Sequence, residues 1–137
     1  MNASFHISLP CRDIERTRSF YTEVLGASTG RSSSNWLDVD LFGHQMTFTK
    51  GKKFNFNYPH YNFEGQILPS FHFGVILREQ EWNSLYQKLT ETQGRSIEKG
   101  IFLMDRSGEH QSFFVKDPDD YTIEFKCFRN PEEMFRG

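Results

Sequence analysis

Short segments with a strand-like pattern alternate along this chain with two longer segments that have a helical pattern. Successive side chains of a strand point to opposite faces, so apolar residues at every second position indicate a strand with one buried face. Segments with this pattern span residues 5–9, 36–42, 44–49, 71–75, 101–104, 111–115 and 121–128. A strong turn signal, Asp117-Pro118-Asp119-Asp120, separates the last two. The pattern therefore predicts a chain rich in short strands.

Two segments between these strands carry apolar residues about 3.6 positions apart, which is typical of amphipathic helices. The apolar positions are Ile14, Phe20, Tyr21, Val24 and Leu25 in the first segment, and Trp82, Leu85, Tyr86 and Leu89 in the second. Asp13 can cap the start of the first helix, and Gly26 and Gly94 fit the left-handed position that follows a last helical turn. We therefore expect one helix in each half of the chain.

The two halves resemble each other. Phe5-His6 opens a strand whose following helix ends at Gly26, and Phe71-His72 opens a later strand whose helix ends at Gly94. Each half is predicted to run strand, helix and three strands. The length of 137 residues favours a single domain, residues 1–137. Its predicted parts are module one (1–50), a connecting loop (51–69), module two (70–128) and a tail (129–137).

Composition narrows the classes of function. Lys plus Arg number 16 and Asp plus Glu number 18, and the resulting net charge of −2 leaves no broad basic surface for nucleic acid. No apolar run approaches the about 20 residues of a membrane-spanning helix, and the N-terminus lacks the pattern of a signal peptide. Without such a signal, the expected location is the reducing cytoplasm, where Cys11 and Cys127 stay free thiols.

Three polar residues fall on strand faces that the apolar residues do not occupy. His6 and His72 hold equivalent places in the two halves, and Glu124 lies on the last strand. If the halves pair about a pseudo-twofold axis, two imidazoles and one carboxylate meet, and this donor set suits Fe(II), Mn(II), Ni(II) or Zn(II). Such an ion acts as a Lewis acid on substrate oxygens. The plainer alternative is that each histidine is a packed or surface residue and that Glu124 pairs with Lys126.

These segments, in this order and spacing, make the chain similar to a known superfamily. The matching pieces are FHISLPCRDIERTRSFYTEVLG, WLDVDLFGHQMTF, SFHFGVIL and FFVKDPDDYTIEFK. They resemble the vicinal oxygen chelate superfamily, which includes glyoxalase I, extradiol dioxygenases, and fosfomycin- and bleomycin-resistance proteins. The resemblance implies an α+β fold, in which two βαβββ modules form a cupped mixed sheet with flanking helices around a metal. It does not specify a reaction.

The resemblance also implies roles for individual residues. His6 and His72 match the metal ligands on the first strands of the two modules, and Glu124 matches the carboxylate ligand on the last strand. His110 lies in the predicted loop before the FFVKD strand, where the family often places substrate contacts. Its imidazole, with an ordinary pKa of about 6.5, can act as an acid or base. His110 and Glu124 are therefore the candidate catalytic residues, although a solvated polar loop would also explain His110 and its neighbours Asp105, Arg106 and Glu109.

One family position is not matched. It falls near the end of the HQMTFTK strand, where glyoxalase I enzymes place a Glu and this chain has Thr47 and Thr49. His44 or Gln45 could replace that ligand only if the strand register shifts. The departure argues against glyoxalase I and leaves a His, His, Glu set that resembles extradiol dioxygenases and the thiol-transferase branch.

Two hypotheses of function follow. The first is a metal-dependent enzyme, a dioxygenase or a glyoxalase-type lyase, that acts on a small molecule chelating the ion through two neighbouring oxygens. The second is a metal-free protein that binds a small molecule, as bleomycin-resistance proteins do. In the connector, Tyr58, His60 and Tyr61 could line a lid or simply pack. In both cases we expect a homodimer, with each site built within one chain or across two.

Overall fold

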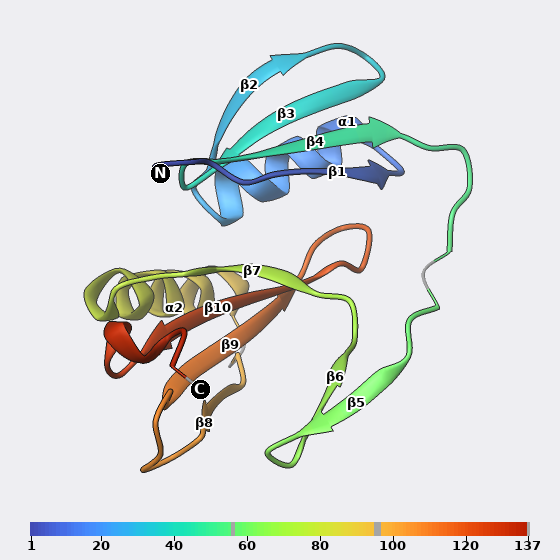
Figure 1. The fold of residues 1–137 in the computed structure, drawn as a ribbon. Coiled ribbons are helices and arrows are strands. Elements are labelled where there is room, and N and C mark those ends of the chain that lie inside the picture. The colour runs from blue at the N-terminus through green and yellow to red at the C-terminus, as the bar shows by residue number, and fades with distance from the viewer. Residues whose placement is uncertain (56, 95–96, 137) are drawn as a thin grey trace. The chain divides into compact units, whose positions relative to one another are not determined.

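The computed structural model describes residues 1–55, 57–94 and 97–136 (Figure 1). The chain divides into two compact units. The first contains Met1–Phe56 and Asp117–Asp119, and the second contains Asn57–Lys116 and Asp120–Gly137. Over the described ranges, no helix has both the length and the apolar character needed to cross a membrane.

The first unit is a four-stranded mixed sheet with one helical segment. Its strands are β1 (His6–Cys11), β2 (Ser28–Ser32), β3 (Trp36–Leu41) and β4 (His44–Lys50), in the spatial order β1-β4-β3-β2. β1 runs parallel to β4, and the other neighbours are antiparallel. Helix α1 (Ile14–Ser19) continues as the π-helical turn η1 (Phe20–Val24). The Asp13 side chain accepts a hydrogen bond from the Arg16 amide, so the predicted cap is confirmed.

The second unit repeats this topology. Its strands are β7 (Phe73–Ile76), β8 (Lys99–Phe102), β9 (His110–Lys116) and β10 (Thr122–Phe128), in the order β7-β10-β9-β8. β7 is parallel to β10, as β1 is to β4, and helix α2 (Glu79–Gln93) follows the first strand. Gly94 ends α2 in the left-handed conformation, with a φ of 60°. The predicted α+β fold is confirmed, and each half runs strand, helix and three strands.

Alternation along β10 separates an apolar face from a polar one. Tyr121, Ile123 and Phe125 are buried, and Trp82 of α2 packs edge-on against Phe113 of β9 with ring centroids 5.0 Å apart. The Trp82 indole N–H donates to the Phe125 carbonyl oxygen at 2.8 Å. Each such buried side chain contributes roughly 2 kcal/mol of hydrophobic stabilisation. The opposite face of β9 and β10 is left to carry polar side chains.

The β9–β10 turn belongs to the first unit. The carboxylate oxygen Oδ1 of Asp119 accepts hydrogen bonds from the Arg12 amide at 3.0 Å and from the Arg12 guanidinium at 3.2 Å. The Tyr21 hydroxyl donates to Asp117 at 3.1 Å. The turn that the sequence predicts at Asp117-Pro118-Asp119-Asp120 therefore also supplies the first unit with two buried carboxylates.

Two predictions about strand starts are wrong. Phe5 was expected on the buried face of the first strand, but its side chain is 60% exposed because β1 begins only at His6. His72 was expected within a strand, but β7 begins at Phe73, so His72 lies directly before it. In addition, β2 has no counterpart in the apolar pattern, since each of its residues is exposed.

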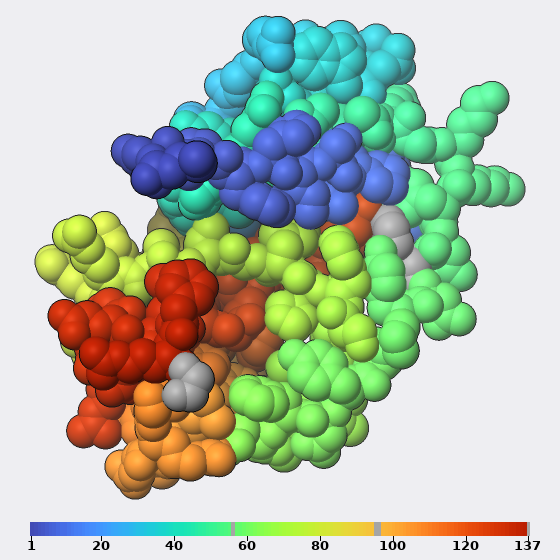
Figure 2. All heavy atoms as spheres, in the orientation of Figure 1, coloured from blue at the N-terminus to red at the C-terminus, as the bar shows by residue number. Residues whose placement is uncertain are grey.

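The connector at residues 51–69, expected to be a loop, contains a hairpin. Its strands are β5 (His60–Phe63) and β6 (Gln66–Pro69), paired antiparallel. The turn residues Glu64 and Gly65 both have positive φ, 51° and 81°, as a type I′ turn requires. Glu64 also forms an ion pair with Arg106 in the loop after β8, and the surfaces of the hairpin (green) and of that loop (orange) adjoin in Figure 2.

Candidate functional site

The second unit brings two of the predicted metal ligands together. Nε2 of His72, directly before β7, lies 3.3 Å from Oε2 of Glu124, in the middle of β10. Both side chains are largely buried, with 20% and 11% of their surface exposed. Because β7 and β10 are paired in parallel, the residue before β7 and the third residue of β10 meet on one face of the sheet.

A glycine allows this close approach. Gly74 lies opposite Glu124 in the β7–β10 register. A Cβ atom added to Gly74 would lie 1.8 Å from the Glu124 carbonyl oxygen and 2.7 Å from its carbonyl carbon. The two backbones are therefore closer than any side chain at position 74 permits. Gly74, two positions after His72, therefore allows the strand that carries Glu124 to approach, and it also leaves room beside the histidine.

The His72 ring is held in one orientation. Its Nδ1 lies 2.9 Å from the Pro69 carbonyl oxygen, and a carbonyl can only accept, so Nδ1 carries the proton. In the neutral imidazole the lone pair is then on Nε2, the atom that faces Glu124. Tyr61 of the hairpin stacks parallel to the ring with centroids 6.4 Å apart, and Phe114 of β9 meets it edge-on at 6.4 Å.

The Glu124 carboxylate is held on its other oxygen. The buried Ser112 hydroxyl donates to Oε1 at 2.7 Å, and the Lys126 ammonium lies 3.7 Å from the same atom. Oε1 therefore faces β9 and Lys126, while Oε2 faces His72. Alternation along the last strand places Glu124 and Lys126 on one face, and the structure adds Ser112 from the neighbouring strand β9.

A pocket of about 260 Å³ opens over this pair within the second unit. His110 and Lys126 line it together with His72 and Glu124. Its walls are mainly aromatic and come from the hairpin and from β8: Tyr61, Phe63, Leu68 and Phe102. Such a mixture of apolar walls and a few convergent polar groups is typical of small-molecule sites.

His110 is the first residue of β9 and not part of the loop before it, as the sequence had suggested. Its ring stacks on Phe102 with centroids 5.2 Å apart, and Nδ1 lies 2.8 Å from the Gly108 carbonyl oxygen, to which it donates. Burial lowers the pKa of His110 below its ordinary value of 6.5. The hydrogen bond to the Gly108 carbonyl offsets part of this effect, the Lys126 ammonium lowers the pKa further, and Glu124 raises it. At neutral pH the ring is therefore uncharged, and its Nε2, which has no hydrogen-bond partner in the described part of the chain, is a base.

The first unit contains the third predicted ligand. His6 begins β1, is exposed, and lies next to Gln45 of β4 in the strand register. Thr47, at the unmatched family position, donates its hydroxyl to Oδ1 of Asp38 at 2.7 Å. Asp38 is a buried carboxylate that the sequence pattern did not single out. Its other oxygen, Oδ2, accepts a hydrogen bond from the side-chain amide of Gln45 at 3.3 Å. The Thr47 hydroxyl is therefore already hydrogen-bonded to the Asp38 carboxylate.

The chemistry of the His72–Glu124 pair fits a divalent ion. One imidazole nitrogen with its lone pair exposed and one carboxylate oxygen lie side by side, and the second imidazole nitrogen is fixed by a backbone carbonyl, as is usual for metal-binding histidines. Among the described residues, no three His, Cys, Asp or Glu side chains are gathered in an arrangement that could hold a metal. His72 and Glu124 would supply two of the three predicted ligands, and the ligand roles of His72, Glu124 and His6 remain predictions.

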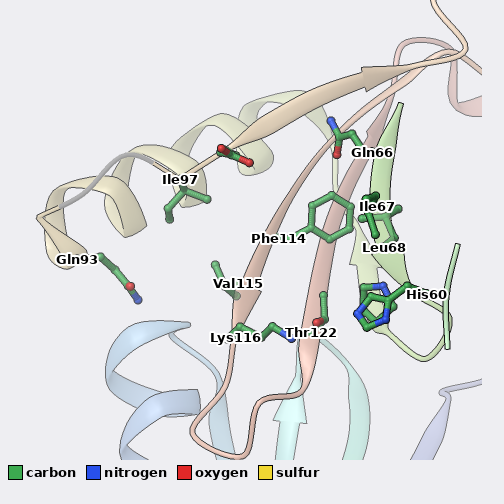
Figure 3. Close-up of a pocket in the computed structure, with 12 residues that line it drawn as sticks. His60, Gln66, Ile67, Leu68, Gln93, Ile97, Phe114, Val115, Lys116 and Thr122 are labelled. Carbon is green, nitrogen blue, oxygen red and sulfur yellow. The ribbon is translucent and has the colours of Figure 1, made fainter. Parts of the chain in front are cut away.

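A larger cavity of about 480 Å³ lies beside the hairpin in the same unit (Figure 3). Phe114, Lys116 and Thr122 line it from β9 and β10, and His60 and Leu68 line it from the hairpin. It contains none of the predicted ligands. Leu68 lines both cavities.

The other candidates from the sequence have different surroundings. The Asp105 backbone amide donates a hydrogen bond to the Glu109 carboxylate at 2.6 Å, and Glu109 also forms an ion pair with Arg129 at 3.2 Å. The Asp105 amide and the Arg129 guanidinium lower the pKa of Glu109 below its ordinary value. Tyr58 stacks on Phe71 with centroids 4.9 Å apart. Among Tyr58, His60 and Tyr61, the connector residues that the sequence suggested could line a lid, Tyr61 lines the pocket over Glu124.

Comparisons with known proteins agree with this architecture. A family model described as "Glyoxalase/Bleomycin resistance protein/Dioxygenase superfamily" matches residues 4–125. No curated protein matches the chain. Among solved structures, a glyoxalase/bleomycin resistance protein/dioxygenase from Alicyclobacillus acidocaldarius is 25% identical, with a TM-score of 0.79 over 98% of this chain and 97% of that one.

Two further solved structures share the fold at lower identity. A genomically encoded fosfomycin resistance protein, FosX, from Listeria monocytogenes is 17% identical, with a TM-score of 0.64 over 98% of this chain and 99% of that one. A virulence protein from Salmonella typhimurium is 20% identical, with a TM-score of 0.61 over 93% of this chain and 98% of that one.

Proposed function

Since this chain belongs to the glyoxalase/bleomycin resistance protein/dioxygenase superfamily, we propose that it is a metal-dependent enzyme for a small molecule with two neighbouring oxygens. His72 and Glu124 would hold a divalent ion, Fe, Mn, Ni or Zn, together with His6. When bound, the ion supplies Lewis acidity toward the substrate oxygens. The observation that carries this proposal is the 3.3 Å approach of His72 Nε2 to Glu124 Oε2, each with its other polar atom already engaged.

His110 is the proposed acid–base residue. Its ring is buried against Phe102 and Phe128, so its position is fixed, and it lines the same pocket as Glu124. The lowered pKa keeps it neutral at pH 7, and its Nε2 can accept a proton from a substrate held over Glu124. Lys126, at the same pocket, provides a positive charge that favours an anionic substrate or product.

The pocket walls favour one alternative, a metal-free binding protein. The aromatic side chains of Tyr61, Phe63 and Phe102 line a cavity of about 260 Å³, which suits a small apolar or aromatic ligand. In that case His72 and Glu124 would form part of the pocket wall and Lys126 would orient the ligand. The two hypotheses differ in whether binding of the small molecule requires a metal.

Metal content and catalysis together test the proposal. Protein purified without added metal is analysed for bound elements, then reconstituted in turn with Fe(II), Mn(II), Ni(II) and Zn(II). Each form is assayed with catechols and with the methylglyoxal–glutathione adduct. We expect one equivalent of ion per chain and turnover of a substrate with neighbouring oxygens. Tight binding of an aromatic compound by metal-free protein, with no ion retained at any concentration tested, would establish the binding-protein alternative instead.

The variants His72→Ala and Glu124→Gln provide the residue-level test. We expect both to lose the ion, because His72→Ala removes the nitrogen donor and Glu124→Gln removes the negative charge of the carboxylate donor. His44→Ala is a matched control, since His44 accepts a hydrogen bond from the Phe5 amide and lies in the first unit. We also propose a cytoplasmic homodimer, which light scattering of the purified protein and fractionation of cells would test.

A further inference from the structure

The Ser112 hydroxyl donates a hydrogen bond that holds one oxygen of the Glu124 carboxylate. Ser112 is fully buried in β9, and its hydroxyl donates to Oε1 of Glu124 at 2.7 Å. In the β9–β10 register Ser112 lies opposite Lys126, so it reaches Glu124 diagonally across the ladder on the same sheet face. Water cannot compete for a hydroxyl at such a site, and the bond is correspondingly strong.

The two carboxylate oxygens therefore have different surroundings. Oε1 accepts the Ser112 hydroxyl and lies 3.7 Å from the Lys126 ammonium. Oε2 faces Nε2 of His72 at 3.3 Å. The carboxylate cannot rotate about its last bond without losing the hydrogen bond from Ser112. A freely rotating glutamate would present either oxygen, or both, to an ion.

We propose that Ser112 is a positioning residue for the metal site: its hydroxyl holds Oε1 so that Glu124 presents Oε2, as a single ligand atom, beside Nε2 of His72. This inference rests on the proposed role of His72 and Glu124 as ligands. Ser112 does not itself contact the ion or the substrate. It acts by removing the rotational freedom that Glu124 would otherwise lose on binding.

A neighbouring residue offers a matched control. Thr122 lies two positions before Glu124 on the same strand face, and it is also buried, but its hydroxyl has no hydrogen-bond partner among the described residues. Thr122→Val removes a buried hydroxyl at nearly constant volume, as Ser112→Ala does. The two variants differ in whether the lost hydroxyl holds Glu124.

Titration with Mn²⁺ followed by calorimetry, and with Co²⁺ followed by visible absorption, tests the inference on the full-length chain. We expect Ser112→Ala to bind Mn²⁺ about 10- to 100-fold more weakly, the range usual for loss of such an outer contact, and to alter the Co²⁺ spectrum. Ser112→Thr, which keeps the hydroxyl, should recover most of the affinity. Thr122→Val should bind as the unaltered protein does, and circular dichroism should show that all variants fold.

The possible results separate the role of Ser112 from the proposed function. If the unaltered protein binds Mn²⁺ and Ser112→Ala binds it equally well with the same Co²⁺ spectrum, the positioning role is wrong while the proposed function stands. Equal losses in Ser112→Ala and Thr122→Val would also overturn it, because the effect would then be one of packing. If the unaltered protein binds neither ion, the proposed function fails and the role of Ser112 fails with it.

Discussion

Replacement of Gly74 by alanine is the perturbation whose effect follows most directly from the geometry. The added Cβ would lie 1.8 Å from the Glu124 carbonyl oxygen, whereas an ordinary contact between carbon and oxygen is about 3.3 Å. The backbones of β7 and β10 must therefore separate by roughly 1.5 Å at this point, because neither atom is at the end of a flexible side chain. We expect the free energy of unfolding to fall by about 3 kcal/mol, which is the upper part of the range for overpacked sites.

The same displacement moves Glu124 away from His72. A ligand site tolerates displacements of about 0.5 Å, so the alanine variant should also lose most of its affinity for Mn²⁺. Urea unfolding followed by circular dichroism measures the first effect, and calorimetric titration measures the second.

Gly30→Ala is the control for this prediction. Gly30 also lies in a strand, β2, but a Cβ there would meet Asp38 at an ordinary 3.4 Å. We expect the free energy of unfolding of Gly30→Ala to change by no more than about 0.5 kcal/mol, and its metal binding to be unchanged. A Gly74→Ala protein with the stability and affinity of the unaltered chain would refute the argument from close backbone approach.

Three further predictions concern stability. Asp119→Ala removes the buried acceptor of the Arg12 amide and should cost about 2 kcal/mol in urea unfolding, with little of it from the half-exposed guanidinium; an unchanged midpoint would contradict this. Trp82→Phe removes the indole donor to the Phe125 carbonyl and part of a buried ring, and it should lower the free energy of unfolding by about 2–3 kcal/mol. An unchanged free energy of unfolding would contradict this. The unfolded chain binds a proton at His110 near pH 6.5, whereas the folded protein binds it only at lower pH, so the stability should fall as the pH is lowered through 6.5. Thermal melts of His110→Gln should show a weaker dependence of the melting temperature on pH. The same dependence in both proteins would count against a neutral buried ring.

Local patterns in the sequence predicted much of the fold. Asp13 caps α1 and Gly94 ends α2 in the left-handed conformation, as their residue types indicate. Alternation along β10 correctly assigned Ile123 and Phe125 to the buried apolar face and Glu124 to the opposite one. These features depend on residues close together in the chain, so the pattern of side chains is sufficient to infer them.

Features that depend on pairing between distant segments could not be predicted in the same way. The partner of Glu124 on β9, Ser112, follows from strand register, and the need for glycine at position 74 follows from the distance between two backbones. The hairpin was missed because its turn, Glu64-Gly65, lacks the usual Asn-Gly or Asp-Gly signal. β2 was missed because exposure of all its residues leaves no alternation to detect.

The central claim is that His72 and Glu124 hold a divalent ion through one nitrogen and one oxygen. Crystals grown with Co²⁺ and measured at the cobalt absorption edge test it most directly. We predict one anomalous difference peak per chain, about 2.0–2.2 Å from both Nε2 of His72 and Oε2 of Glu124, with the imidazole of a His6 as a further ligand. An ion bound elsewhere on the chain, with these two atoms still 3.3 Å apart and no peak within reach of either, would contradict the account.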